Sequence, residues 1–468
     1  MLVTLRFYGG VDEIGGNRIL VEDRGTRIFL DFGMSFSKCG EFFEEFLKPR
    51  YSCTGMKDLL TLRLLHYVDG IYRPDLLRLL GRTPHAQPSV EGVVLSHIHQ
   101  DHSAYISLLD PKITVYCSET TSCYAKCAVE AGQRGLETEL FNFKERPLVD
   151  TRAPAIPRQF STLANERSVD IGSMKVKPFM VDHSVPGAMS FLVYASDATI
   201  AYTGDLRLHG AHGDLTKRFV DEAAKDEVDI LLCEGTRIDE QEGFSEEYVA
   251  ENASRVVDGC KELVIADFAY KDLDRFLTFY NIARNNDRKL AISKRHAYLL
   301  SELSKSSGVG GIPSLDDENI VIYLDRKGTG KYRPTDYAIW ERDFLGRSNT
   351  HDADWIHNHQ GEVVAALTFF DMGELIDIQP NPGSVYIHSS SEPYNEEQTI
   401  DQARLDHWLN FFGLDKYHFH ASGHASGQEI RNIVETINPK KVIPIHTEKA
   451  ELFQTMHTNV ERPRLEDY

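Results

Sequence analysis

EGVVLSHIHQDH, residues 91–102, is an apolar run that ends in a loop with four potential metal ligands. Short apolar runs of this kind are typical of strands buried in a sheet. Four other runs end in the same way, beside a residue that can bind a metal or a proton. They are MKVKPFMVDHS with His183, ATIAYTGDLR with Asp205, VDILLCEGTR with Glu234, and KKVIPIHTE with His446. Because strands of one sheet present such ends along one edge, we expect these residues to converge on one site.

The ligand density in residues 97–102 favours two metal ions over one. His97 and His99 can bind a first ion, and Asp101 and His102 a second, with His183 completing the first site and His446 the second. Asp205 has two carboxylate oxygens and can bridge the ions. Neutral imidazole and carboxylate suit Zn²⁺. Two ions about 3.5–4 Å apart can share a hydroxide that acts as the nucleophile of a hydrolase.

The rest of the chain predicts a discontinuous domain. Residues 1–33 alternate apolar and polar residues between glycine-rich turns, which indicates a meander of strands, and residues 37–90 have irregular helical periodicity. Strand and helix patterns alternate between Thr236 and about Gly413, which is typical of a parallel sheet covered by helices. We therefore predict a first domain over residues 1–236, an inserted α/β domain over 237–413, and a return to the first domain over 414–468.

Composition excludes several classes of protein. The chain has 468 residues, of which 41% are hydrophobic and 26% charged, as in ordinary globular proteins. We find no apolar run long enough to cross a membrane and no signal-peptide pattern at the start, and so expect a cytoplasmic protein without a membrane partner. The net charge of −20 argues against non-specific coating of nucleic acid, although metal ions can supply local positive charge in a groove.

The same residues resemble a known superfamily. HIHQDH is similar to the HxHxDH motif of the metallo-β-lactamase superfamily, His183 to its next single-histidine motif, and Asp205 to its bridging aspartate. Asp31 in LDFG resembles an early strand-end aspartate that supports the metal loop by hydrogen bonding. The resemblance implies a four-layer αββα fold and two divalent ions, with Zn²⁺ favoured and Mn²⁺ as the alternative.

The second half of the chain is similar to the β-CASP branch of that superfamily, and in particular to ribonuclease J. The three matching stretches are CEGTR with Glu234, HASGHASGQE with His424, and VIPIHTEKAE with His446. This resemblance implies an inserted β-CASP domain and catalytic roles for Asp101, Glu234 and His424. A histidine in the third stretch is associated in this branch with RNA substrates. We therefore expect a ribonuclease of single-stranded RNA, acting as a 5′ to 3′ exonuclease, an endonuclease or both.

Several alternatives stay open at this point. A thioester or lactone hydrolase can use the same metals, and a non-catalytic scaffold of an RNA-processing complex can keep the fold; a homodimer is also open. Ser389, Ser390 and Ser391 can hold a substrate phosphate, or form a turn or helix cap. We expect the basic stretches at Lys271, residues 294–296 and residues 326–333 to be surface charges. Cys117, Cys123 and Cys127 are expected to be reduced cysteines in or near a helix.

Overall fold

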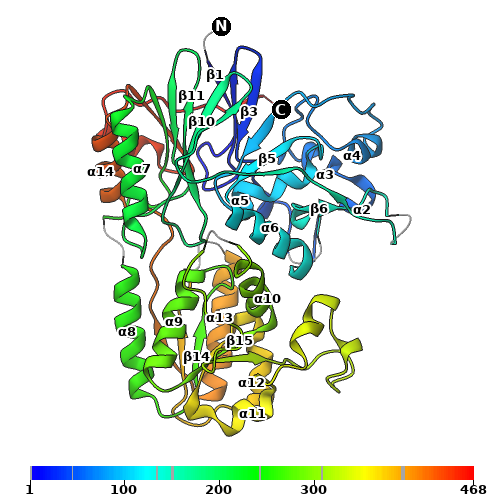
Figure 1. Cartoon of the computed structure of the whole chain (residues 1–468), viewed down its shortest axis with the longest axis vertical. Helices are drawn as coiled ribbons and strands as arrows, with labels where there is room; N and C mark the ends of the chain where they lie inside the picture. Colours follow the sequence, from blue (N-terminus) through cyan, green and yellow to red (C-terminus); the bar gives the residue numbers. More distant parts are fainter. Residues whose placement is uncertain are drawn as a thin grey trace.

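The computed structural model describes residues 3–44, 46–132, 135–148, 152–241, 244–306, 309–391 and 396–467. Two six-stranded sheets lie in the upper half of Figure 1. The first has the order β1 (Thr4–Gly9), β2 (Arg18–Asp23), β3 (Thr26–Leu30), β4 (Gly92–Val94), β5 (Thr114–Cys117) and β8 (Phe160–Thr162). The second has the order β21 (Lys441–Ile445), β13 (Ile230–Glu234), β12 (Thr199–Tyr202), β11 (Met189–Tyr194), β10 (Met174–Met180) and β9 (Val169–Ile171). A two-stranded sheet joins β6 (Asn142–Phe143) to β7 (Ile156–Pro157).

The two large sheets pack face to face through alternating residues of their strands. Ile19, Val21 and Ile28 of the first sheet share one buried cluster with Val193, Ile200 and Leu232 of the second. The opposite faces are covered by helices. These helices are α1 (Phe36–Gly40), α2 (Tyr51–Thr54), α3 (Lys57–Thr61), α4 (Pro74–Leu79), α5 (Gln100–Ser103) and α6 (Glu119–Ala131) with the first sheet, and α7 (Gly213–Lys225) and α14 (Gly427–Ile437) with the second. The predicted αββα order is therefore confirmed.

A third sheet of seven parallel strands lies below in Figure 1. Its order is β17 (Thr350–His351), β16 (Ile320–Tyr323), β15 (Lys289–Ser293), β18 (Val363–Ala366), β14 (Val264–Asp267), β19 (Val385–His388) and β20 (Asp415–His418). Helices α8 (Glu246–Gly259), α9 (Leu273–Asn285) and α10 (Lys294–Leu303) cover one face. Helices α11 (Ala353–Asn358), α12 (Leu375–Ile378) and α13 (Glu396–Phe412) cover the other. Short 3₁₀ helices are η1 (Ala104–Leu108), η2 (Leu136–Thr138), η3 (Pro334–Asp336), η4 (Ile339–Phe344), η5 (Gln360–Glu362), η6 (Phe369–Glu374) and η7 (Ala450–Thr455).

The inserted sheet extends beyond the boundary that we predicted at residue 413. Strand β20 pairs in parallel with β19, from Val385 opposite Asp415 to His388 opposite His418. The four residues of β20 are exposed and polar, so they lack the apolar run by which buried strands are recognised. We therefore place the end of the inserted domain after His418. The chain then returns through α14 to β21, which pairs with β13 of the second sheet.

The segment predicted as irregular, residues 37–90, lies between two neighbouring parallel strands of the first sheet, β3 and β4. Its side chains Met56, Leu59 and Leu76 belong to the same buried cluster as Phe29 of β3. The segment is thus an enlarged crossover that covers the sheet. Within the described part of the chain, no helix has the length and apolar character required to span a bilayer.

A buried ion network ties the inserted domain to the second sheet. Arg207, which follows β12, contacts Asp182 at 2.9 Å, Glu246 of α8 at 2.9 Å and Asp274 of α9 at 3.2 Å. Arg275 of α9 reaches the same Glu246 at 3.0 Å. The guanidinium group of Arg207 is fully buried, so Asp182 and Asp274 depend on it for charge compensation, while Glu246 is compensated by both Arg207 and Arg275.

Replacing Arg207 with methionine should therefore destabilise the protein strongly. The substitution keeps most of the side-chain volume but leaves buried carboxylates without their counter-charge, which costs about 3–5 kcal/mol. The matched control is Arg218→Met, because Arg218 forms an exposed pair with Glu166 and should contribute less than about 1 kcal/mol. Equilibrium denaturation of the full chain compares the two variants. Equal effects at both positions would contradict the role given to the network.

Candidate metal centre

The predicted ligands come together at the ends of strands, as expected. Residues 97–102 form the loop after β4 and the short helix α5. His183 follows β10, Asp205 follows β12, and His446 follows β21. Since β12, β13 and β21 are parallel neighbours, their carboxyl ends lie along one edge. The site is thus assembled from distant segments of chain by the pairing of strands.

The ligand atoms form two groups that share Asp205. The first group is His97, His99, His183 and Asp205, and the second is Asp101, His102, Asp205 and His446. In the first, the Nδ1 atom of His99 lies 3.1 Å from the Nε2 atoms of both His97 and His183. In the second, Nε2 of His446 lies 3.2 Å from Oδ2 of Asp101, and Nε2 of His102 lies 3.1 Å from Oδ2 of Asp205. A tetrahedral shell with bonds of about 2.0–2.1 Å places neighbouring ligand atoms about 3.3 Å apart, so these distances fit metal coordination.

Hydrogen bonds on the outer side of the rings orient the histidines. Nδ1 of His183 donates to the carbonyl oxygen of Gly423 at 2.6 Å, and Nδ1 of His102 donates to Asp31 at 2.6 Å. Nδ1 of His446 is hydrogen-bonded to the hydroxyl of Thr236 at 2.8 Å. Each ring then turns its Nε2 atom inward. Such partners are usual around metal sites because they set the tautomer and the direction of the ligand.

Asp31 is hydrogen-bonded to Ser96 and His102 of the loop that holds the candidate ligands. Its carboxylate is fully buried and accepts hydrogen bonds from the backbone and hydroxyl of Ser96 at 2.6 and 2.7 Å, and from Tyr202 at 2.5 Å. Its backbone φ of 56° and that of His446, 52°, lie in the left-handed region that non-glycine residues rarely adopt. Strained backbone of this kind is concentrated at functional sites.

The cluster has the chemistry of a metal site. Both oxygens of Asp205 and Nε2 of His102 are buried without a hydrogen-bond partner among the described residues. Burial holds the pKa of His97 and His99 well below the usual range, and burial also lowers the pKa of His183 to about 4. These rings are therefore neutral at pH 7, which is the form that binds a metal. The donor set is nitrogen and oxygen, which suits a divalent ion of the zinc type.

Glu234 and His424 lie beside this cluster. The carboxylate of Glu234 is fully buried and accepts hydrogen bonds from the backbone of Leu206 at 2.9 Å and from Nδ1 of His424 at 3.0 Å. Nδ1 of His424 is also 3.8 Å from Asp205. Burial opposes protonation of His424, but Glu234 and then Asp205 raise its pKa to about 9. His424 therefore carries a proton next to the ligand shared by the two groups.

The structure assigns other roles to several residues that the sequence analysis singled out. The hydroxyl of Ser389 donates to the carbonyl of Phe419 at 2.7 Å and accepts a hydrogen bond from Arg275, so it is engaged within the protein. Ser390 is half-buried and Ser391 is exposed. Lys294 and His296 are buried rather than on the surface as expected, because α10 turns them inward. The three cysteines at 117, 123 and 127 are free thiols in or near α6.

Some supporting residues gave no clear signal in the sequence. Ser96, Thr236 and Gly423 act through hydrogen bonds to histidines, and such pairs depend on contacts between distant segments.

The glycine-rich turn GGVDEIGG, residues 9–16, did carry a signal in the sequence. Gly15 has a φ of +80°, and a β-carbon there would lie 2.6 Å from the side chain of Asp101, so glycine allows the turn to pack against the metal loop.

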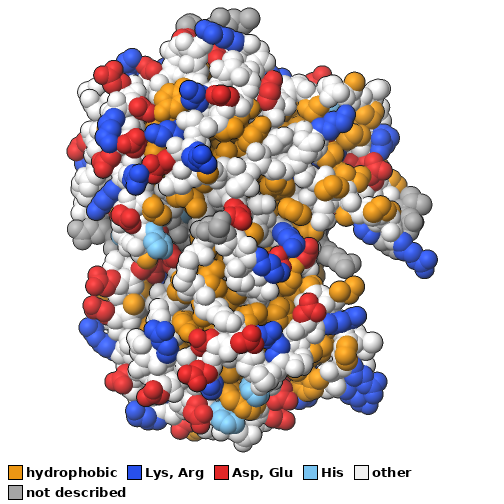
Figure 2. All heavy atoms as spheres, viewed as in Figure 1, with side chains coloured by type: hydrophobic (Ala, Val, Ile, Leu, Met, Phe, Trp, Pro, Cys, Tyr) orange, Lys and Arg blue, Asp and Glu red, His pale blue; other side chains and the backbone are white. Residues whose placement is uncertain are grey.

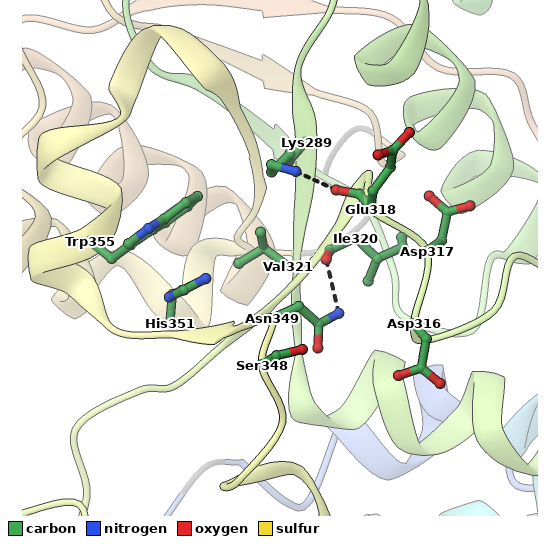
Figure 3. Close-up of a pocket in the computed structure, with 10 residues that line it drawn as sticks. All are labelled: Lys289, Asp316, Asp317, Glu318, Ile320, Val321, Ser348, Asn349, His351 and Trp355. Carbon is green, nitrogen blue, oxygen red and sulfur yellow. Dashed lines mark hydrogen bonds between the residues drawn. The ribbon is translucent and has the colours of Figure 1, made fainter.

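A separate cavity of about 260 Å³ lies at the amino ends of β15 and β16 (Figure 3). Lys289, at the start of β15, donates to the carbonyl of Glu318, and Asn349 donates to that of Ile320 at 3.0 Å. None of the residues that line it belongs to the ligand groups. The ligands follow β4, β10, β12 and β21 instead, so the cavity is not the candidate site.

Two protein-family models match the parts of the chain that hold most of the candidate site residues. Residues 69–254 match the Beta-lactamase superfamily domain, and residues 414–457 match the Zn-dependent metallo-hydrolase RNA specificity domain. Ribonuclease J of Mycolicibacterium smegmatis is 25% identical over 94% of this chain and 67% of its own length. Ribonuclease J of Pyrococcus abyssi is 22% identical over 96% of this chain and 90% of its own length.

A solved structure has the same fold along the whole chain. It is described as a protein of unknown function from Enterococcus faecalis V583, with a TM-score of 0.74, 22% identity and 99% coverage of both chains. The superfamily and the ribonuclease J resemblance predicted from the sequence are thus confirmed. The chain thus contains a beta-lactamase superfamily domain and a Zn-dependent metallo-hydrolase RNA specificity domain, and it is similar over nearly its whole length to ribonuclease J.

Proposed function

We propose that this protein is a metal-dependent ribonuclease that hydrolyses single-stranded RNA with two divalent ions. The observation that carries the proposal is the pair of ligand groups sharing Asp205, with His424 held beside it by a hydrogen bond of 3.0 Å to Glu234. The match of residues 414–457 to an RNA specificity domain and the relatives named ribonuclease J support RNA as the substrate. Zn²⁺ suits the ligands best, and Mn²⁺ is the alternative.

The roles of the residues follow from their positions. Divalent ions held by the two ligand groups would lower the pKa of bound water and offset negative charge on phosphoryl oxygens. His424, held by Glu234, is placed to protonate the leaving oxygen of the cleaved phosphodiester. Asp31, Thr236 and the carbonyl of Gly423 keep the histidine rings in the binding orientation.

The first prediction that follows from this proposed function concerns metal content. Protein purified without chelator should hold about two divalent ions per chain, and Asp101→Ala should lose mainly the second, because Asp101 belongs to only one ligand group. Elemental analysis by mass spectrometry measures both. Asp170→Ala is the matched control, since Asp170 is exposed on β9 and should leave the content unchanged. A content near zero in the unaltered protein would remove the basis of the proposal.

A second prediction separates catalysis from metal binding. His424→Ala should keep its metals and lose about 10²- to 10⁴-fold in the rate of RNA cleavage, because it removes a proton donor and no member of the first two ligand groups. His183→Ala should lose metal, because its Nε2 atom faces His99 and Asp205. Metal analysis and initial rates are measured on the same preparations. If the His424 variant loses metal as readily as the His183 variant, its role is wrong.

The third prediction concerns the end of the RNA. If the loop after β19 holds a terminal phosphate, RNA with a 5′ monophosphate should be cleaved faster than RNA with a 5′ triphosphate, because the triphosphate is bulkier. Because Ser389 is engaged within the protein, the double variant Ser390→Ala, Ser391→Ala should erase this preference and keep any internal cleavage. End-labelled RNAs with either terminus measure it. Ser389→Ala is the contrasting variant, which should lower stability rather than change the preference.

Two results would contradict this account at different levels. Equal cleavage of both 5′ ends by the unaltered protein would remove the terminal-phosphate pocket and leave the nuclease intact. Efficient thioester hydrolysis without RNA cleavage would remove the nuclease function itself.

A further inference from the structure

Lys271 lies where the inserted domain meets the metal domain. It is in the loop between β14 and α9, and its carbonyl oxygen accepts a hydrogen bond of 2.9 Å from the hydroxyl of Tyr124 on α6. Tyr124 is fully buried, so this contact fixes the loop across the junction. The Lys271 ammonium contributes to the electrostatic environment of His99, and the charge of Asp101 acts on Lys271 in turn. The half-buried Lys271 side chain thus lies at the junction beside the metal domain, and is not an isolated surface charge as the sequence predicted.

A second cation, Arg295 at the start of α10, lies beside Lys271. The Nζ atom of Lys271 is 6.0 Å and the guanidinium carbon of Arg295 is 5.3 Å from the centre of the Tyr270 ring. Burial, opposed by Asp101 and reinforced by Arg295, lowers the pKa of Lys271 to about 8. The two positive charges therefore act on each other, and the ring that they share offsets part of this repulsion.

Neighbouring basic side chains are paired, in contrast to these two. Lys126 and Lys305 contact Glu302 at 2.7 and 2.6 Å, and Lys294 contacts Asp325. Among the residues that the structure describes, no carboxylate lies within ion-pair distance of Lys271 or Arg295. In a chain of net charge −20, two adjacent cations without an acidic partner next to the metal centre are suited to a bound anion. Figure 2 shows that acidic and basic side chains are otherwise interspersed over the face in view.

We propose that Lys271 and Arg295 form a phosphate-binding site in which the inserted domain holds the backbone of the RNA strand beside the metal centre. The inference rests on the ribonuclease function proposed above. Lys271, which is half-buried at the junction, contacts the phosphate nearest the cleaved bond as a compact point charge. Arg295 is exposed and takes the next phosphate with its planar group of donors. Contacts of this kind position a strand without reading its sequence.

The test measures binding of a short single-stranded RNA with a 5′ monophosphate to the full, metal-loaded chain. Fluorescence anisotropy is recorded over a range of salt concentrations in the His424→Ala background, so that the RNA stays intact. Lys271→Ala and Arg295→Ala should each weaken binding several-fold. Each should also reduce the slope of log affinity against log salt by about 0.7, the value for one lost phosphate contact on a single strand. Lys271→Arg should restore most of the affinity, and metal content should be unchanged.

The matched control is Arg284→Ala at the other end of α9. Arg284 lies 5.6 Å from the ring centre of Tyr280, the same cation–aromatic arrangement, but about 18 Å along the helix from Lys271. It should leave affinity and salt slope unchanged. In the unaltered background, Arg295→Ala should raise KM and leave kcat nearly constant, because it acts on binding of the strand.

The outcomes separate this proposal from the one on which it rests. If the unaltered protein cleaves RNA while the Lys271 and Arg295 variants bind it as tightly, the phosphate site is overturned and the nuclease stands. If Lys271→Ala loses metal, the lysine acts on Asp101 and the proposal is equally overturned. If the unaltered protein neither binds nor cleaves RNA, both proposals fail together.

Discussion

The carboxylate of Asp205 is the group on which the rest of the structure depends. It is buried, both of its oxygens lack a hydrogen-bond partner among the described residues, and it belongs to both ligand groups at the site. A buried carboxylate is stable only with compensating positive charge. In this chain His424, whose pKa Glu234 and Asp205 raise to about 9, supplies part of that charge, and divalent ions held by the surrounding histidines would supply the rest. Two residues later Arg207 anchors the same turn to the inserted domain.

The path of the chain explains why the inserted domain lies next to the metal centre. The chain leaves the second sheet after β13 and returns to it at β21, and these two strands are parallel neighbours. The carboxyl end of β14 leads into the loop of Lys271, which Tyr124 of α6 holds against the metal domain. The buried pairs of Arg207 and Arg275 with Glu246 fix the other side of the junction. This arrangement places the inserted domain where the proposed Lys271 and Arg295 site can contact RNA bound at the metal centre.

The local parts of this arrangement could be predicted from the sequence. The ligands lie at the ends of short apolar runs, and both the runs and the residue types are visible in a few adjacent positions. The exposed edge strand β20 has no such run, and its pairing with β19 was missed. Lys294 and His296 looked like surface charges because their burial depends on how α10 packs. The engagement of Ser389 by Arg275 and the position of Lys271 likewise arise from contacts between segments far apart in sequence.

The central claim is that two ions share Asp205. Anomalous diffraction from crystals of the metal-loaded protein, recorded on both sides of the zinc and manganese absorption edges, tests it directly. The account predicts two peaks about 3.5–4 Å apart with the carboxylate of Asp205 between them. One should be bound by His97, His99 and His183, and the other by Asp101, His102 and His446. A single peak, or two peaks that do not share Asp205, would contradict it.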